Sequence, residues 1–333
     1  MEKMQPERVR RNYGERALKK IIFDTDIGGD CDDAGALAIL HEAANAGKAK
    51  LLAVTLSTSS PYAAGCADAI NRYYGRPLPV GQTKRIAPGE DVNAYESSYG
   101  KAICERFENG YAHNEAPQDA VRLLRKILAE NEGEKITIVA VGNFSNLAGL
   151  LMSVGDDLSP LDGRKLVTRQ VEKIVAMGCF FPSAEIKEVW FGDWKMEAEF
   201  NIAVDVPSAR TVAALCPVPV YFAHYLTGMN VLTGAALIEK DKNNPAGQSY
   251  DIHSKGNRSS WDPAAAFFAV YGGGGVFTAE RRGEVTIDEK GVSLFRPDGA
   301  GNRYLNDCTN EREAEKRLDE AMCGESQFPS SVI

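Results

Sequence analysis

The chain has 333 residues and a formal net charge of -8, with 44% hydrophobic and 25% charged residues. These fractions are those of an ordinary globular protein, and the length is enough for one large α/β domain or two smaller ones. The acidic balance argues against nucleic acid or an anionic membrane as the main partner, because both attract basic surfaces. A small-molecule ligand fits the composition better.

The N-terminal residues 1–18 are charged and contain no apolar stretch, so we expect neither a secretory signal nor a membrane anchor there and place the protein in the cytoplasm. The seven cysteines are an odd number without a CxxC pair. This pattern favours reduced thiols over a disulfide framework or a zinc knuckle.

Strands and helices alternate in the first half of the chain. KKIIFD at 19–24 predicts a strand, Gly28 and Gly29 a turn, and AGALAILHEAANAG at 34–47 a helix. LLAVTLST at 51–58 predicts a buried strand, followed by a helix near 63–74. A helix over 117–131, a strand over 136–141 and a helix after Gly142 continue the pattern.

The second half continues with a strand at 172–178, a helix from about 206 and a strand in PVPVYFA at 217–223. After a strong helix from 263, a hairpin over 285–295 and an amphipathic helix over 310–323 close the chain. The alternation predicts an open, mostly parallel, Rossmann-like α/β sheet flanked by helices. Because no linker or repeat divides residues 1–333, we expect one domain, with 225–262 as a mobile segment over the site.

An acidic cluster follows the first predicted strand. The string DTDIGGDCDDAGAL contains five aspartates, at positions 24, 26, 30, 32 and 33. Helix capping accounts for one or two of them, whereas five would repel one another and raise one another's pKa unless a cation intervened. Hard oxygen ligands suit calcium or magnesium better than zinc. The sequence therefore predicts a bound divalent ion at the carboxyl end of this strand.

The same string resembles the DxDPGxDDA signature of the inosine-uridine type nucleoside hydrolases, with Ile27 in place of the proline and two additional residues before Asp32. VAVGNFSNLAGLL at 139–151 resembles that family's TGPLTNLA segment, and VAMG at 175–178 resembles its MGG segment. EAEFNIAVD at 197–205 and WDP at 261–263 are similar to AEFNxxxD and HDP. The resemblance implies the nucleoside hydrolase fold, hydrolysis of an N-riboside to ribose and free base, a calcium cofactor, and a homodimer or homotetramer.

The resemblance also implies the ligands of the calcium ion: the carboxylates of Asp26, Asp33 and Asp262 and the backbone carbonyl of Val141, supported from behind by Asp24. A water beside such an ion loses a proton more readily, and Asp26 is the candidate base that accepts it. The resulting hydroxide attacks the anomeric carbon through an oxocarbenium-like transition state. The implied substrate-binding residues are Asp32, Met177, Asp193, Glu199, Asn201 and Trp261.

Three positions depart from the family pattern. The histidine that protonates the departing base in purine-active members is Trp261 here, which either stacks on the base or fills the core. Other donors are candidates in the segment 225–262, namely His253, Tyr250 and Arg258. Asp193 and Ser60 stand where the family has asparagines, which changes the hydrogen-bond donors near the sugar. The sequence therefore leaves the leaving group open.

Two other functions remain open from the sequence. KKIIFDTD also fits a magnesium-dependent phosphatase of the haloacid dehalogenase type, although Gly28 stands where Thr or Val is usual. Alternatively, a non-catalytic, calcium-dependent ribose or nucleoside binder would keep the metal site without the acid, and Trp261 favours this reading.

Overall fold

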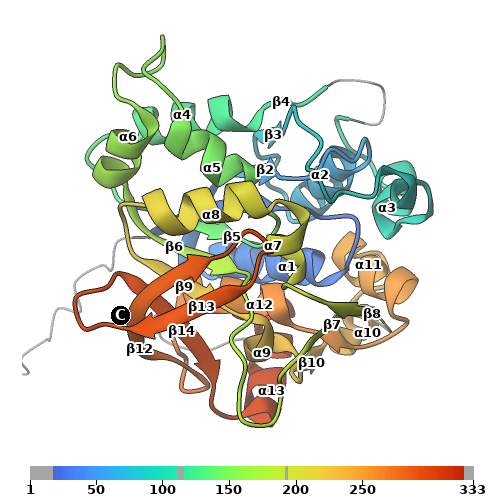
Figure 1. Cartoon of the computed structure of the whole chain (residues 1–333). Helices are drawn as coiled ribbons and strands as arrows, with labels where there is room; N and C mark the ends of the chain where they lie inside the picture. The colour runs from blue at the N-terminus through green and yellow to red at the C-terminus, as the bar shows by residue number, and fades with distance from the viewer. Residues whose placement is uncertain (1–17, 112–115, 192–193, 326–333) are drawn as a thin grey trace, which may run out of the picture.

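The computed structural model describes residues 18–111, 116–191 and 194–325 (Figure 1). Its centre is a ten-stranded sheet in the order β13-β12-β14-β9-β6-β5-β1-β2-β3-β4. β12 runs antiparallel to both of its neighbours, and the other neighbouring pairs are parallel. The strands are β1 (Lys19–Thr25), β2 (Ala49–Leu56), β3 (Val80–Gln82), β4 (Gln118–Asp119), β5 (Ile136–Ala140), β6 (Val171–Met177), β9 (Val220–Ala223), β12 (Phe277–Ile287), β13 (Ser293–Pro297) and β14 (Arg303–Cys308).

Helices cover both faces of the sheet, and the residues of β1 show why. Ile21 and Phe23 belong to one buried apolar cluster and Ile22 to another, because successive side chains of a strand point to opposite faces. A strand buried on both faces reads as an apolar run, as KKIIFD does. The first cluster includes α1 (Asp32–Asn45), α2 (Ala63–Tyr73), α11 (Pro245–His253), α12 (Trp261–Tyr271) and α13 (Glu311–Met322); the second includes α4 (Ala120–Glu130), α5 (Ser145–Met152), α6 (Gly163–Gln170) and α8 (Val206–Leu215).

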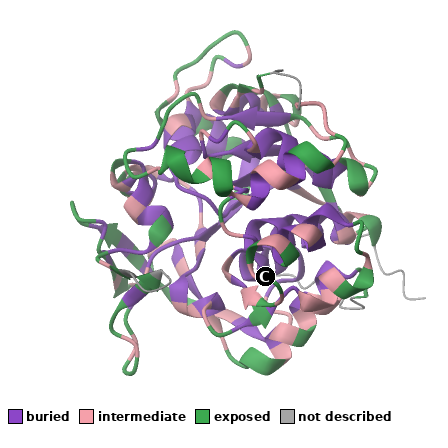
Figure 2. Cartoon of the chain, turned by 90° about the vertical axis from the view of Figure 1, so that its right-hand side faces the viewer, coloured by how far each residue is buried: buried purple, intermediate pink, exposed green. Residues whose placement is uncertain are grey.

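Buried residues fill the interior between these layers, and exposed residues gather on the outer sides of helices and loops (Figure 2). The predicted mostly parallel α/β sheet is thus confirmed, including the hairpin of β12 and β13. The sequence did not predict the short strands β3 and β4, nor β14, which lies between β9 and β12. No helix among the described ranges is long and apolar enough to cross a membrane.

The segment 225–262 folds into short elements beside the carboxyl ends of the strands. These are α9 (Tyr225–Gly228), β10 (Leu232–Thr233), α10 (Ala235–Lys240), α11 and β11 (Arg258–Ser259). The remaining elements are η1 (Val92–Ser97), α3 (Tyr99–Arg106), the hairpin of β7 (Val189–Phe191) and β8 (Trp194–Met196), and α7 (Phe200–Val204). Of the predicted N-terminal extension, residues 1–17 lie outside the described part.

The direction of the chain through the sheet creates a crevice at β1. After β1 the chain builds β2, β3 and β4 on one side, and it then crosses to build β5 and β6 on the other side. At such a switch point the loops after neighbouring strands diverge, which leaves space for a ligand at the carboxyl ends. The backbone N–H of Val141, just after β5, donates to the carbonyl of Asp24 over 2.7 Å, so the ends of β1 and β5 lie side by side.

Candidate active site

The loop between β1 and α1 brings the acidic cluster into this crevice. Gly28 has a φ of +124°, a backbone conformation that side chains other than glycine rarely adopt. The loop is held from outside, because Gly28 N–H donates to the Tyr99 hydroxyl over 2.9 Å and α3 packs closely against it. Asp32 and Asp33 then fall in the first turn of α1, where its dipole favours negative charge.

Three buried carboxylates from two distant segments converge here. Asp32, Asp33 and Asp262 each offer an oxygen within 4.8 Å of the others. Asp262 lies in the first turn of α12, and its backbone N–H donates to Asp32 Oδ2 over 3.1 Å. Asp33 accepts a hydrogen bond from the Thr25 hydroxyl. Two helix N-termini therefore point their acidic first turns at the same spot.

This cluster is poorly compensated in charge. Burial raises the pKa of Asp33 well above its ordinary value, and the neighbouring Asp26 and Asp32 raise it further. Burial and then Asp32, Asp33 and Asp26 raise the pKa of Asp262 in the same way. No described lysine or arginine forms an ion pair with either group. An all-oxygen, negatively charged and buried donor set fits a hard divalent cation.

Asp26 lies at the edge of the cluster and is half-buried. Its carboxylate is not one of the three that approach within 4.8 Å, but it is near enough to raise the pKa of both Asp33 and Asp262. Burial, followed by Glu90, Glu199 and Asp24, raises its own pKa to about 7. A carboxylate with a pKa near neutrality accepts a proton more readily than an ordinary aspartate.

Asp24 lies behind the cluster rather than in it. Its Oδ1 accepts hydrogen bonds from the Thr55 hydroxyl at 2.6 Å and from Asn146 Nδ2 at 2.7 Å. Its Oδ2 is buried without a partner, and burial raises its pKa to about 7. An orphaned carboxylate oxygen at this depth is costly unless charge of opposite sign lies nearby, which supports the reading of a cation site.

The segment around β6 and α7 supplies the neighbouring wall. Asn201 Nδ2 donates to the Val141 carbonyl over 2.7 Å and lies 3.1 Å from Met177 Sδ. The Val141 carbonyl keeps a second lone pair for another partner. Glu199 caps α7, accepting from the backbone N–H groups of Asn201, Ile202 and Cys179. Glu199 therefore caps a helix and also lines the cavity.

These groups surround one cavity of about 630 Å³. The sequence-predicted residues that line it are Asp26, Asp32, Asp33, Val141, Met177, Glu199, Asn201, Trp261 and Asp262. Ser60 lines it as well, whereas Asp24 does not. Asp193 lies outside the described residues, so its predicted contact with the sugar stays a prediction.

An aromatic wall closes one side of the cavity. Trp261 Nε1 donates to the Tyr225 carbonyl over 2.8 Å, and the two rings stack with centroids 5.7 Å apart. The Tyr225 hydroxyl donates to the Trp190 carbonyl over 2.9 Å. The guanidinium of Arg258 lies 5.2 Å from the centre of the Trp261 ring. Trp261 therefore lines the cavity with its N–H already engaged.

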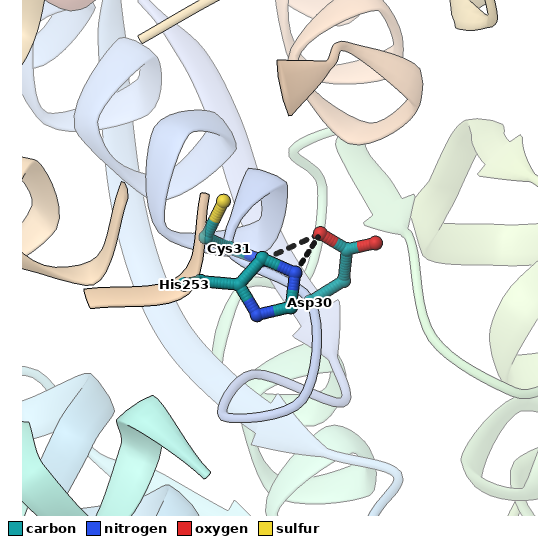
Figure 3. Close-up of side chains that lie close together, drawn as sticks. All are labelled: Asp30, Cys31 and His253. Carbon is teal, nitrogen blue, oxygen red and sulfur yellow. Dashed lines mark hydrogen bonds and ion pairs between the residues drawn. The ribbon is translucent and has the colours of Figure 1, made fainter. Parts of the chain in front are cut away.

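Asp30, which stands two residues before Asp32 in the motif, is held by Arg258. Arg258 Nε and Nη2 reach Asp30 Oδ2 at 3.1 and 2.5 Å. His253 Nε2 lies 3.4 Å from Asp30 Oδ1, and Figure 3 shows these two side chains facing each other. Asp30, Cys31 and His253 also bring three ligand-type atoms together, but the guanidinium already compensates the carboxylate there. His253 lines the cavity, whereas Arg258 does not.

The structure corrects two of the three candidate proton donors, because neither Arg258 nor Tyr250 lines the cavity. Tyr250 is fully buried beneath the site and does not line the cavity, because its ring packs against Gly35 and Gly234 in the core. The sequence also missed Glu90, Asp91, Tyr95 and Asn143, all of which line the cavity. Only Asn143 had a detectable signal, since it belongs to the GNFSN string after β5.

Comparisons with known proteins identify the family and the fold. The model of the inosine-uridine preferring nucleoside hydrolase family matches residues 21–293. The structure is similar to the inosine-uridine preferring nucleoside hydrolase from Bacillus anthracis, with a TM-score of 0.70 and 17% identity, covering 92% of this chain and 100% of that one.

Two further solved structures show the same fold. The purine-preferring ribonucleoside hydrolase from Gardnerella vaginalis has a TM-score of 0.68 and 17% identity, covering 92% of this chain and 99% of that one. The type III effector protein XopQ, complexed with adenosine diphosphate ribose, has a TM-score of 0.70 and 15% identity, covering 93% and 95%. No curated protein sequence matches the chain.

The family match reaches from β1 to the start of β13, so it includes the segments of Asp26, Asn201 and Asp262 and not the DxD string alone. A phosphatase of the haloacid dehalogenase type would leave these later segments unexplained. The chain belongs to the inosine-uridine preferring nucleoside hydrolase family and is an N-glycosyl hydrolase of nucleosides.

Proposed function

We propose that the protein hydrolyses a ribonucleoside or related N-riboside to ribose and free base, using a calcium ion held by Asp26, Asp33, Asp262 and the Val141 carbonyl. The observation that carries the proposal is the meeting of buried carboxylates from the first turn of α1 and from α12 in one cavity. Carboxylate and carbonyl oxygens are the ligands that calcium prefers, and the backbone carbonyl disfavours zinc. A bound divalent ion would lower the pKa of a water and hold ribose hydroxyls.

Asp26 is the proposed general base. It lines the cavity and lies close enough to Asp33 and Asp262 for their charges to interact with it. It would take a proton from the attacking water as the oxygen bonds to the anomeric carbon. The bond from that carbon to the base nitrogen breaks, and its electron pair leaves with the base.

Asp32, Glu199 and Asn201 are the proposed sugar-binding residues, with Met177 as the apolar contact. All four line the cavity. Carboxylates around the sugar stabilise the positive charge that develops on it in the transition state more than they stabilise the neutral sugar. Asp24 would act from behind, because its two hydrogen bonds fix it at the end of β1.

A panel of purine, pyrimidine and nicotinamide ribosides, with release of reducing sugar as the readout, tests the proposal. We expect hydrolysis of at least one riboside, loss of activity in chelator, recovery with calcium, and a fall in kcat of at least about a hundredfold in Asp26→Asn. Activity that survives both chelator and Asp26→Asn would contradict the metal and base assignments. Calcium-dependent ribose binding in a calorimeter, with no riboside cleaved, would identify a binder instead.

A further inference from the structure

The cavity is lined by many acidic side chains and few basic ones. Eight carboxylates line it, whereas no lysine or arginine does so among the described residues; the eight are Asp26, Asp30, Asp32, Asp33, Glu90, Asp91, Glu199 and Asp262. A divalent ion and the pairing of Asp30 with Arg258 would offset three of these formal charges and leave five. A site of this kind attracts cations and repels phosphates.

Glu90 is the clearest surplus charge, because it lies outside the segments that resemble the nucleoside hydrolase motifs. Its carboxylate accepts hydrogen bonds from neutral groups, namely the Thr58 hydroxyl at 2.7 Å, the Ser59 N–H at 2.6 Å, the Ala87 N–H at 3.0 Å and the Tyr95 hydroxyl. No ion pair to Glu90 is formed within the described ranges. These donors fix the carboxylate in place without cancelling its charge.

The aromatic wall offers no proton to a departing base. The indole N–H of Trp261 and the hydroxyl of Tyr225 both donate to backbone carbonyls, and the Tyr95 hydroxyl donates to Glu90. His253 is the one imidazole in the lining, and its Nε2 faces Asp30 Oδ1 at 3.4 Å. Without a proton from His253, a neutral base that leaves this cavity would depart with a negative charge, which the acidic lining disfavours.

We propose that the cavity selects N-ribosides without phosphate whose heterocycle carries a positive charge, such as N-ribosylpyridinium compounds and N7-alkylated purine nucleosides. This inference rests on the proposed N-riboside hydrolysis. When the bond from the anomeric carbon to the cationic nitrogen breaks, the electron pair neutralises the heterocycle, which leaves without a proton. Water supplies the new oxygen, and one proton is released overall. Such a substrate needs no proton donor at the position of Trp261, where the family has histidine. The surplus carboxylates attract the positive charge of its heterocycle.

Matched substrate pairs test the charge requirement. 7-Methylguanosine and guanosine differ by one methyl group and one charge on the leaving group. We expect the ratio of their kcat/KM values to equal or exceed the ratio of their uncatalysed hydrolysis rates, because the aromatic wall supplies no proton to guanine. Nicotinamide riboside should exceed nicotinamide mononucleotide by at least about tenfold in kcat/KM, because the added phosphate meets uncompensated carboxylates.

Three variants test which side chains determine the 7-methylguanosine to guanosine ratio. Glu90→Gln should lower the 7-methylguanosine to guanosine ratio by about tenfold, since one uncompensated negative charge is removed from the cavity lining. Any change in the basicity of Asp26 acts on both substrates and cancels in the ratio. Glu172→Gln, the same exchange on an exposed part of β6 away from the cavity, should keep the wild-type ratio. Trp261→His should lower the ratio by raising the guanosine rate, because it restores a proton donor beside Asp262.

The outcomes separate this inference from the proposed function. Hydrolysis of guanosine with a ratio well below the uncatalysed one would show that the site delivers a proton, and it would overturn the inference while the hydrolase assignment stands. Equal rates for the riboside and its phosphate would overturn it as well. If no riboside of either charge is cleaved in the presence of calcium, the proposed function itself fails.

Discussion

Asp33 and Asp262 show how a pair of ordinary side chains acquires a specific chemistry through its surroundings. Each would cap or complement a helix N-terminus in isolation, a role worth about 1 kcal/mol. Here the two helices aim at one point, so their carboxylates are buried side by side, and Asp33 accepts a hydrogen bond from the neutral Thr25 hydroxyl. The cost of burying these charges is what a bound cation would relieve.

Asp33→Asn tests whether the Asp33 carboxylate binds the cation. The exchange keeps the size of the side chain but removes one negative charge from the ligand set, so we expect calcium affinity to fall at least about a hundredfold in calorimetry. Asp162→Asn is the matched control, because Asp162 caps α6 far from the cavity and asparagine caps equally well. A calcium affinity unchanged in Asp33→Asn would exclude Asp33 as a ligand.

Arg258→Lys tests the role of the pair of Arg258 and Asp30. Lysine keeps the charge but loses the forked contact with Asp30 and the planar contact with the Trp261 ring. We expect KM to rise about fivefold with kcat changed by less than about threefold, since Arg258 does not line the cavity. Steady-state kinetics measures both; a large loss of kcat with an unchanged KM would instead give Arg258 a direct part in the reaction.

At the scale of elements, local patterns account for what the sequence could predict. β1, β2, β5 and β6 are long apolar runs, and their helices have clear ends, so their positions could be read directly. β3, β4 and β10 have two or three residues each, too few for a periodic pattern. Glu90 and Tyr95 enter the cavity on a loop and a short 3-10 helix, whose place depends on tertiary contacts alone.

The placement of Asp262 depends on the packing of α9 against the start of α12. A Cβ added to Gly228 would lie 2.5 Å from both the N and the Cα atoms of Trp261, a distance that backbone atoms do not tolerate. Gly228→Ala should therefore displace the first turn of α12, lower calcium affinity at least about tenfold, and lower the free energy of unfolding by about 2 kcal/mol.

Gly299→Ala provides the comparison, because an added Cβ there meets nothing within 4 Å and the backbone needs no left-handed conformation. Calorimetry and denaturant unfolding of the two variants separate a packing effect from a general response to alanine. Unchanged calcium affinity in Gly228→Ala would show that α12 holds Asp262 independently of α9.

At the scale of the whole molecule, the buried acids couple folding to pH. Burial raises the pKa of Asp24, Asp26 and Glu199 to about 7 in the folded chain. The folded protein then binds more protons than the unfolded chain between the ordinary carboxyl pKa and about pH 7, so its stability falls as the pH rises through this window. A bound cation would compensate the ionised carboxylates and so oppose this trend.

We therefore expect the Tm of calcium-free protein to fall between about pH 5 and pH 8, and saturating calcium to raise Tm by roughly 5 °C at pH 8 but less at pH 6. Calorimetric melting with chelator or calcium at several pH values measures this. A calcium effect that is equal at both pH values would contradict the coupling.

The position of β14 has a consequence for how the protein is made. This strand, near the end of the chain, lies inside the sheet, between β9 and the earlier hairpin of β12 and β13. On the ribosome the hairpin emerges first, while the edge of β9 still lacks its partner and could pair wrongly with β12. Correct assembly requires that this gap stay open until residues 303–308 arrive, so a chain cut short before them would present two unpaired edges and tend to aggregate.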